Sequence, residues 1–164
     1  MDPRFFLIFA TDLLNRLRQN QGLSTPGGRA ECRSAISRAY YATFLVAVEF
    51  LNGIGISVTA KGECHTAVNH GLNNSGNQDL KKAASNLGTL GTERRTADYQ
   101  MAQSRPEQIA QVEIAVEMAT QAILALDQIK NDCRADARQG ATIASTILGW
   151  AGLVQNKHLW KTTP

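Results

Sequence analysis

Apolar residues recur at steps of three and four through most of this chain, and they nowhere alternate with polar residues over the length of a strand. A repeat near 3.6 residues gives a helix one buried stripe, whereas a half-buried strand needs strict alternation. Glycines interrupt the periodic stretches at 27–28, 53–55, 71–76 and 88–91. The pattern predicts an all-α protein, folded as an antiparallel bundle of four to five helices.

The breaks set the expected helix boundaries. Residues 21–28 are expected to be a connection, and Asn73-Asn74-Ser75-Gly76 is a turn signal. Gly88 and Gly91 predict either a kink or a close helix contact inside the fourth helix. Ser104 or Arg105 is expected to cap the fifth helix, which Pro106 opens. The five expected helices cover residues 3–20, 29–52, 62–72, 78–103 and 106–133.

The length of 164 residues suits one domain. We expect the bundle to span residues 1–134 and a C-terminal extension, an apolar helix plus a polar tail, to span residues 135–164. Two interpretations of the extension stay open. It is either an extra helix packed on the bundle or a segment that docks on a partner.

Charge and cysteine usage exclude several classes of protein. Lys and Arg total 17 against 14 Asp and Glu, and this net charge of +3 is compatible with a nucleic-acid partner without requiring one. Three cysteines without a CxxC pair exclude a disulfide scaffold and a zinc ribbon. Cys64 and His65 are adjacent, which is poor geometry for shared metal ligation, so we expect neither a metal nor another cofactor.

Two apolar segments bear on localisation. The segment 141–154 is shorter than the roughly 20 residues that a membrane-spanning helix needs. The run 5–10 is followed by no small-residue cleavage pattern, which argues against a signal peptide. The sequence therefore predicts a cytoplasmic protein with no membrane partner.

The first candidate cluster lies in the second expected helix. Arg38, Tyr40 and Tyr41 stand there among small and apolar residues. Either the tyrosines are core residues whose hydroxyls each find one partner, or one hydroxyl and Arg38 face a cleft shared with the fourth helix.

The second cluster is at the end of the fourth expected helix. Arg94 and Asp98 are four residues apart, Arg95 and Asp98 are three apart, and Arg95 and Tyr99 are four apart. One interpretation is a solvated ion pair beside a packing tyrosine. The other is functional, because a guanidinium held by a carboxylate keeps its geometry and can grip a phosphate by two hydrogen bonds.

Three segments in this order resemble the HEPN family of small helical bundles. They are Arg33-Ser-Ala-Ile-Ser-Arg-Ala-Tyr-Tyr-Ala-Thr-Phe44, then His65 in the short third helix, then Arg94-Arg-Thr-Ala-Asp-Tyr99. The resemblance covers residues 5 to 130, and it implies a four- or five-helix bundle that dimerises. Many members of the family are metal-independent ribonucleases of toxin–antitoxin, CRISPR or other phage-defence systems. Other members are not catalytic, and they bind nucleotides or work beside a nucleotidyltransferase.

The ribonucleases of this family use an Arg followed after four to six residues by a His. In that chemistry the RNA's 2′-hydroxyl attacks the adjacent phosphate, the His transfers protons, and the Arg stabilises the phosphorane charge. This chain has Tyr99 five residues after Arg94, and no His occurs between His70 and His158. The missing His favours binding over catalysis.

We therefore predict an RNA- or nucleotide-binding module with a polar cleft. The cleft residues are Arg38, Arg94, Arg95, Asp98 and Tyr99, and further binding candidates are Tyr40, Tyr41 and His65. The alternative is a metal-independent endoribonuclease in which Arg94 holds the phosphate and Asp98 or Tyr99 assists proton transfer. A third interpretation is a structural bundle whose apolar tail docks elsewhere.

The expected protein partners also follow from the resemblance. It implies a nucleotidyltransferase-like or antitoxin protein as a partner, within a toxin–antitoxin or phage-defence system. A homodimer is expected from the resemblance and from the apolar segment Ile143 to Val154.

Overall fold

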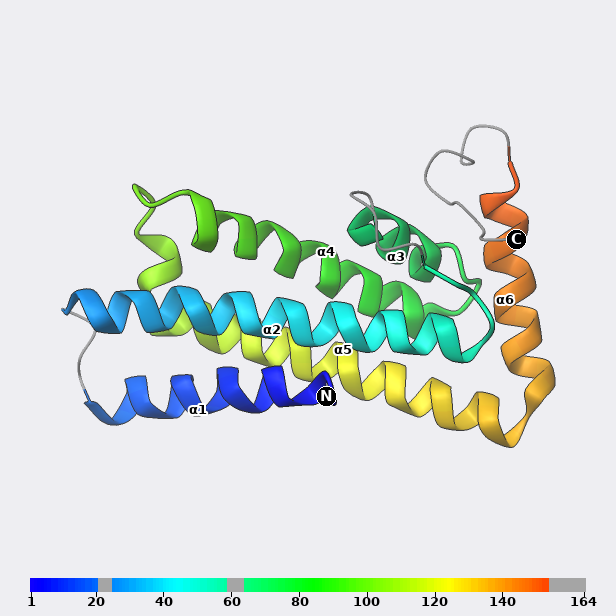
Figure 1. Cartoon of the computed structure of the whole chain (residues 1–164), viewed down its shortest axis with the longest axis horizontal. Coiled ribbons are helices and arrows are strands. Elements are labelled where there is room, and N and C mark those ends of the chain that lie inside the picture. The colour runs from blue at the N-terminus through cyan, green and yellow to red at the C-terminus, as the bar shows by residue number, and fades with distance from the viewer. Residues whose placement is uncertain (21–24, 59–63, 154–164) are drawn as a thin grey trace. The chain divides into compact units, whose positions relative to one another are not determined.

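The computed structural model describes residues 1–20, 25–58 and 64–153. Over these ranges it contains six packed α-helices and no strand, which confirms the all-α prediction (Figure 1). The helices are α1 (Arg4–Asn20), α2 (Pro26–Gly53), α3 (Cys64–Asn73), α4 (Gln78–Tyr99), α5 (Ile109–Ala135) and α6 (Ala137–Ala151), and a short 3-10 turn, η2 (Arg105–Glu107), precedes α5.

The chain forms two compact units, each built from separated segments. The first unit comprises residues 1–43 and 86–121, and the second comprises residues 44–85 and the described part of 122–164. Helices α2, α4 and α5 each contribute one part to the first unit and the other part to the second.

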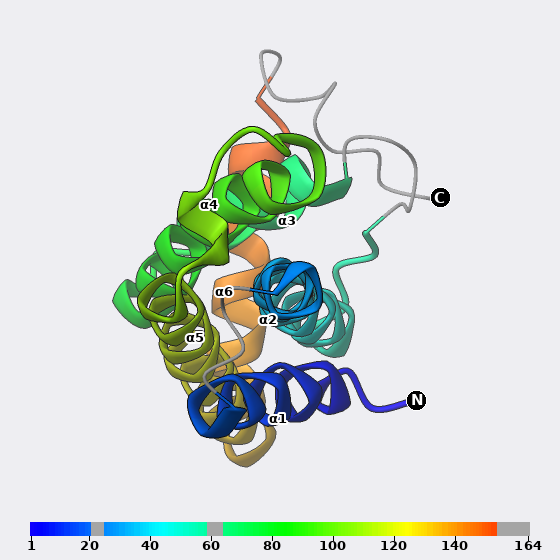
Figure 2. The same ribbon diagram turned by 90° about the vertical axis from the view of Figure 1, so that its left-hand side faces the viewer.

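In the first unit, α1 lies alongside the N-terminal part of α2 (Figure 2). One side of α1 is an apolar stripe that is buried from Ala10 to Leu17 and includes Leu13 and Leu14, whereas Phe6 and Leu7 nearer the N-terminus are only half-buried. Burying one leucine side chain contributes about 1.5–3 kcal/mol, so this stripe holds α1 on the unit.

Helix α2 begins at Pro26, three residues before the expected start, so the prediction of a connection through residue 28 was wrong. The reason is a local cap. The Thr25 Oγ1 accepts a hydrogen bond of 3.0 Å from the Gly28 backbone N–H, and Pro26 supplies a φ angle suited to the first helical turn. These two residues offset the low helix propensity of the adjacent glycines.

Helix α2 ends as expected, at its glycines. Gly55 has a φ of 85°, a left-handed conformation that glycine adopts without strain. The Gly55 N–H donates to the Asn52 carbonyl at 3.1 Å, and the Ile56 N–H donates to the Leu51 carbonyl at 2.9 Å. This is a Schellman ending, and the buried Ile56 anchors the chain after it.

The junction between α4 and α5 differs from the prediction. Helix α4 ends at Tyr99, short of residue 103, and α5 begins at Ile109, after a turn that contains Pro106. Ser104 makes no side-chain cap, so the expected capping of α5 at Ser104 or Arg105, with Pro106 opening the helix, was wrong.

A buried arginine explains this junction. The Arg33 guanidinium of α2 donates to the Ala97 carbonyl at 2.8 Å and also to the Gln103 carbonyl, and its Nε donates to Glu107 Oε1 at 2.9 Å. The last carbonyls of a helix have no partner within the helix, so an arginine here stabilises both the end of α4 and the reversal that follows.

In the second unit, the apolar part of the C-terminal extension forms α6. The Asp136 side chain accepts a hydrogen bond from the Arg138 backbone N–H at 3.0 Å and caps the helix. Ile143 and Ile147 of α6 are buried, and α6 packs against α3. The apolar part of the extension is therefore an additional helix packed in the second unit, and docking of this segment on a partner stays a prediction. The expected polar tail and the first two residues of the expected third helix lie outside the described residues.

Of the described helices, α5 is the one that could cross a membrane by length and composition, and the apolar part of it is only partly buried. Core helices of soluble proteins pass the same test, so this is weak evidence for a membrane. The absence of a membrane partner and the cytoplasmic localisation stay predictions.

Candidate functional site around Arg94

Four side chains of the first unit surround the Arg94 guanidinium. Tyr40 and Tyr41 come from α2, and Asp98 and Tyr99 come from the last turn of α4. The Arg94 Nη2 donates to the Tyr41 hydroxyl at 2.7 Å and to the Tyr99 hydroxyl at 3.2 Å. The Arg94 Nε lies 2.7 Å from Asp98 Oδ2, as the four-residue spacing predicted.

The tyrosine rings enclose the same guanidinium. Its carbon lies 5.2 Å from the Tyr41 ring centroid, 5.3 Å from that of Tyr99 and 5.9 Å from that of Tyr40. These distances are within the range of cation–π attraction. The cation is therefore held by aromatic faces as well as by oxygen atoms.

Gly91 explains how α4 comes this close to Tyr40. A Cβ placed at Gly91 would lie 3.3 Å from Tyr40 Cε2, closer than side-chain contacts ordinarily are. Of the two outcomes predicted for the glycines of α4, the close helix contact is therefore present at Gly91. Tyr40 itself is buried, and its ring meets the Tyr41 ring edge-on, with the centroids 5.4 Å apart.

The ion pair of Arg94 and Asp98 is mostly covered rather than solvated. Their side chains keep 18% and 25% of their accessible surface. The Ser37 hydroxyl of α2 donates to Asp98 Oδ2 at 3.4 Å. The Arg94 Nε is buried and makes no hydrogen bond of ordinary geometry to the residues that the structure describes, so Asp98 holds it as an ion pair. The pair therefore differs from a surface ion pair in water.

The surroundings keep Arg94 charged. Burial acts to lower the pKa of Arg94, but Tyr41, Asp98 and Tyr99 together raise the pKa above its ordinary value. A permanent, immobilised positive charge next to tyrosine hydroxyls suits the binding of an anion.

The outer edge of this site is open. The Tyr99 side chain is 69% exposed, and the neighbouring Arg95 is exposed with one hydrogen bond of 3.4 Å to Thr92 Oγ1. The Arg94 Nη1 has no hydrogen-bond partner within the part of the chain that the structure describes. A ligand at this edge would meet the Arg94 guanidinium and the Tyr99 ring.

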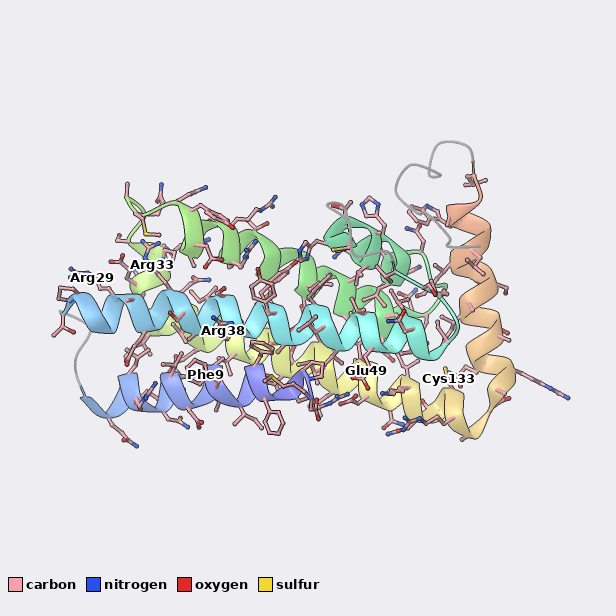
Figure 3. The ribbon with its side chains drawn as sticks, in the orientation of Figure 1. Phe9, Arg29, Arg33, Arg38, Glu49 and Cys133 are labelled. Atoms are coloured by element: carbon pink, nitrogen blue, oxygen red, sulfur yellow. The ribbon has the colours of Figure 1, made fainter. Side chains whose placement is uncertain are left out.

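Two predicted site residues are not part of this cluster. Arg38 extends over the Phe6 ring of α1, 5.5 Å from its centroid, and Figure 3 shows it facing Phe9. Placing Arg38 in the cleft with Arg94 was therefore wrong, because Arg38 is rotated about 100° around α2 from Ser37, which faces Asp98. His65 belongs to the second unit, where its ring centroid lies 4.2 Å from that of Phe44.

Sequence reasoning missed Ser37 and the structural role of Arg33. Ser37 lies four residues before Tyr41, so the helical spacing alone could have placed both on the face toward Arg94. The acceptors of Arg33 are mainly backbone carbonyls, which no side-chain pattern reveals. Within the described ranges, no three His, Cys, Asp or Glu side chains gather as metal ligands.

No family model, no curated protein and no solved structure matches this chain.

Proposed function

We propose that this chain is a HEPN-like module that binds RNA or a nucleotide, with a phosphate held at Arg94. The observation that carries the proposal is the immobilised Arg94 guanidinium beside the exposed Tyr99 ring. A fixed guanidinium loses little side-chain entropy when it binds an anion.

The phosphate would lie against Arg94 and Arg95. The Arg94 Nη2 donates to the Tyr41 and Tyr99 hydroxyls, so Nη1 is the nitrogen that would donate to a ligand. Asp98 holds the Nε side of the group, so it orients the guanidinium without lying between it and the open edge. Arginine is suited to phosphate because its planar donors can make two parallel hydrogen bonds.

The base would stack on Tyr99. This ring is largely exposed, and stacking of a base on an aromatic side chain is worth about 1–3 kcal/mol. Single-stranded RNA is recognised by this combination of cationic groups and aromatic faces. The net charge of +3 on the chain would aid the approach of a polyanion.

The wider setting of this proposal is that of the HEPN resemblance. It comprises an antiparallel bundle that acts as a homodimer in the cytoplasm, beside an antitoxin or nucleotidyltransferase-like partner in a toxin–antitoxin or phage-defence system. The apolar segment that suggested a dimer contains Ile143 and Ile147, and both are buried within the second unit. The dimer proposal therefore rests on the resemblance.

Binding is favoured over catalysis by the groups around Arg94. Asp98 is engaged by Arg94 and by the Ser37 hydroxyl, and a base must be free to accept a proton. Among the residues that the structure describes, no histidine contacts Arg94.

The alternative is a metal-independent endoribonuclease. The observation that favours it is the exposed Tyr99, whose hydroxyl lies 3.2 Å from Arg94 Nη2 and so beside the proposed phosphate. A phenol in that position could give a proton to the leaving oxygen while Arg94 stabilises the phosphorane. If the chain cleaves RNA in EDTA, Asp98→Asn and Tyr99→Phe will identify which group moves the proton.

The test of the binding proposal is a titration of labelled single-stranded RNA with the full chain and its Arg94→Lys variant. We expect Arg94→Lys to weaken binding at least about tenfold although the charge is kept, because a lysine cannot reproduce the planar two-point contact. Arg134→Lys, an exposed arginine in the second unit, is the matched control and should bind like the wild type. Equal affinities for the wild type and Arg94→Lys would contradict the proposal.

A further inference from the structure

Helix α1 presents a row of apolar side chains to solvent. Phe5, Ile8 and Phe9 are 60%, 53% and 48% exposed. Their spacing of three and four residues places them on one edge of the helix. Single exposed apolar residues are ordinary, but a contiguous exposed row of this kind marks an interaction surface.

A hollow of about 350 Å³ lies beside this row. It is lined by Met1, Phe5, Phe6, Phe9 and Arg38. Its walls are apolar except for the Arg38 guanidinium, which extends over the Phe6 ring. Apolar side chains of a partner could enter this hollow while an acidic group of the partner meets Arg38.

Two unpaired charges of opposite sign flank the apolar row. Asp12 follows Ile8 by one turn of α1, so it continues the same row. Asp12 and Arg38 are both exposed, and neither forms an ion pair or hydrogen bond with any residue that the structure describes. By contrast, Arg16, one turn further on, lies 4.0 Å from Glu31 of α2.

We propose that this α1 face, formed by Phe5, Ile8, Phe9, Asp12 and Arg38, pairs with the same face of a second copy of the chain. In a two-fold dimer every contact occurs twice. Arg38 of one copy then faces the partner's Asp12, Asp12 faces the partner's Arg38, and the apolar rows are buried between the two ion pairs.

The charges favour a second copy over other occupants. An anionic membrane or a nucleic acid would face the uncompensated Asp12 carboxylate, and an acidic protein would leave that carboxylate opposed by like charge. A face that carries one unpaired cation and one unpaired anion is complementary to itself. This inference does not rest on the proposed binding at Arg94.

Charge reversal in the full chain tests the pairing. Sedimentation velocity across the micromolar range should give a dimer for the wild type. Arg38→Glu and Asp12→Arg should each raise the dimer dissociation constant at least about tenfold, because each places like charges opposite one another. The double variant, which carries both reversals, should dimerise again. Lys82→Glu and Glu117→Arg make the same charge changes at exposed positions of α4 and α5 and should leave the dimer unchanged.

Loss of the dimer can be distinguished from loss of the fold. Both reversed positions are exposed in the single chain, so circular dichroism should show unchanged helix content. Phe5→Ser, which changes no charge, should also weaken the dimer. The proposal is overturned by a monomeric wild type, by single reversals that dimerise normally, or by a double variant that stays monomeric. RNA binding by the monomeric variants would show that the Arg94 proposal stands whether or not the dimer forms.

Discussion

Replacing Arg33 by methionine should cost the protein about 3–5 kcal/mol of unfolding free energy. The guanidinium is buried and donates to the Ala97 and Gln103 carbonyls and to the Glu107 carboxylate. Methionine keeps much of the volume but leaves these acceptors without a donor. Hydrogen bonds to charged groups contribute about 1.5–3 kcal/mol each, and breaking a buried ion pair from one side costs about 3–5 kcal/mol. The loss is a large share of the roughly 5–15 kcal/mol that stabilises a domain.

Urea unfolding followed by circular dichroism measures this loss, and the chain offers a matched control. Arg29 lies one turn earlier on α2, with its Nε 3.6 Å from the other oxygen of the same Glu107, and its side chain is 44% exposed against 10% for Arg33. Arg29→Met should therefore cost less than about 1 kcal/mol. If Arg33→Met costs no more than Arg29→Met, the explanation of the α4–α5 junction is wrong.

Three further changes test other parts of the structure. Gly91→Val should destabilise the protein by about 1–3 kcal/mol in urea, because its Cβ would press on the buried Tyr40 ring, whereas a Cβ at Gly149 has open space around it, so Gly149→Val should be tolerated better. Asp136→Ala should lose about 1 kcal/mol and lower the helix signal, since it removes the cap of α6; unchanged stability would exclude that cap. Burial, with help from Asp132 and Asp136, raises the pKa of Cys133. Its alkylation by iodoacetamide at pH 8 should therefore be slower in the folded protein than in urea, and equal rates would contradict the raised pKa.

Local signals predicted most of the helices because each of these signals acts within a few residues. The α1 stripe and the glycine ending of α2 needed only the chain's own neighbours. The start of α2 was misplaced because the low helix propensity of two adjacent glycines favoured a later start. The Thr25–Pro26 pair caps the helix by satisfying a backbone donor, and a hydrophobic pattern gives no sign of such a cap. The end of α4 was misplaced for a related reason, since Arg33 is 64 residues from Ala97, one of its acceptors.

The sequence predicted the contacts of the site that lie within one helix. It did not predict the contacts that depend on how two helices pack against each other. Arg94 and Asp98 lie on one helix, and the four-residue spacing was enough to pair them. Arg38 was misplaced because its direction depends on which face of α2 meets α4 and which meets α1. The sequence did not decide whether Tyr41 is a core residue or a cleft residue. Its side chain is half-buried, and its hydroxyl accepts a hydrogen bond from Arg94.

The central claim is that the Arg94 guanidinium itself contacts a phosphate. The Nε–H of Arg94 is buried, and protection from solvent slows proton exchange enough for its resonance to be followed by nitrogen-15 NMR. We expect this resonance, assigned by its loss in Arg94→Lys, to shift saturably on titration with adenosine monophosphate and to stay in place with adenosine. The account would be contradicted if the Arg94 chemical shift did not change with the monophosphate or RNA, or if it changed equally with adenosine.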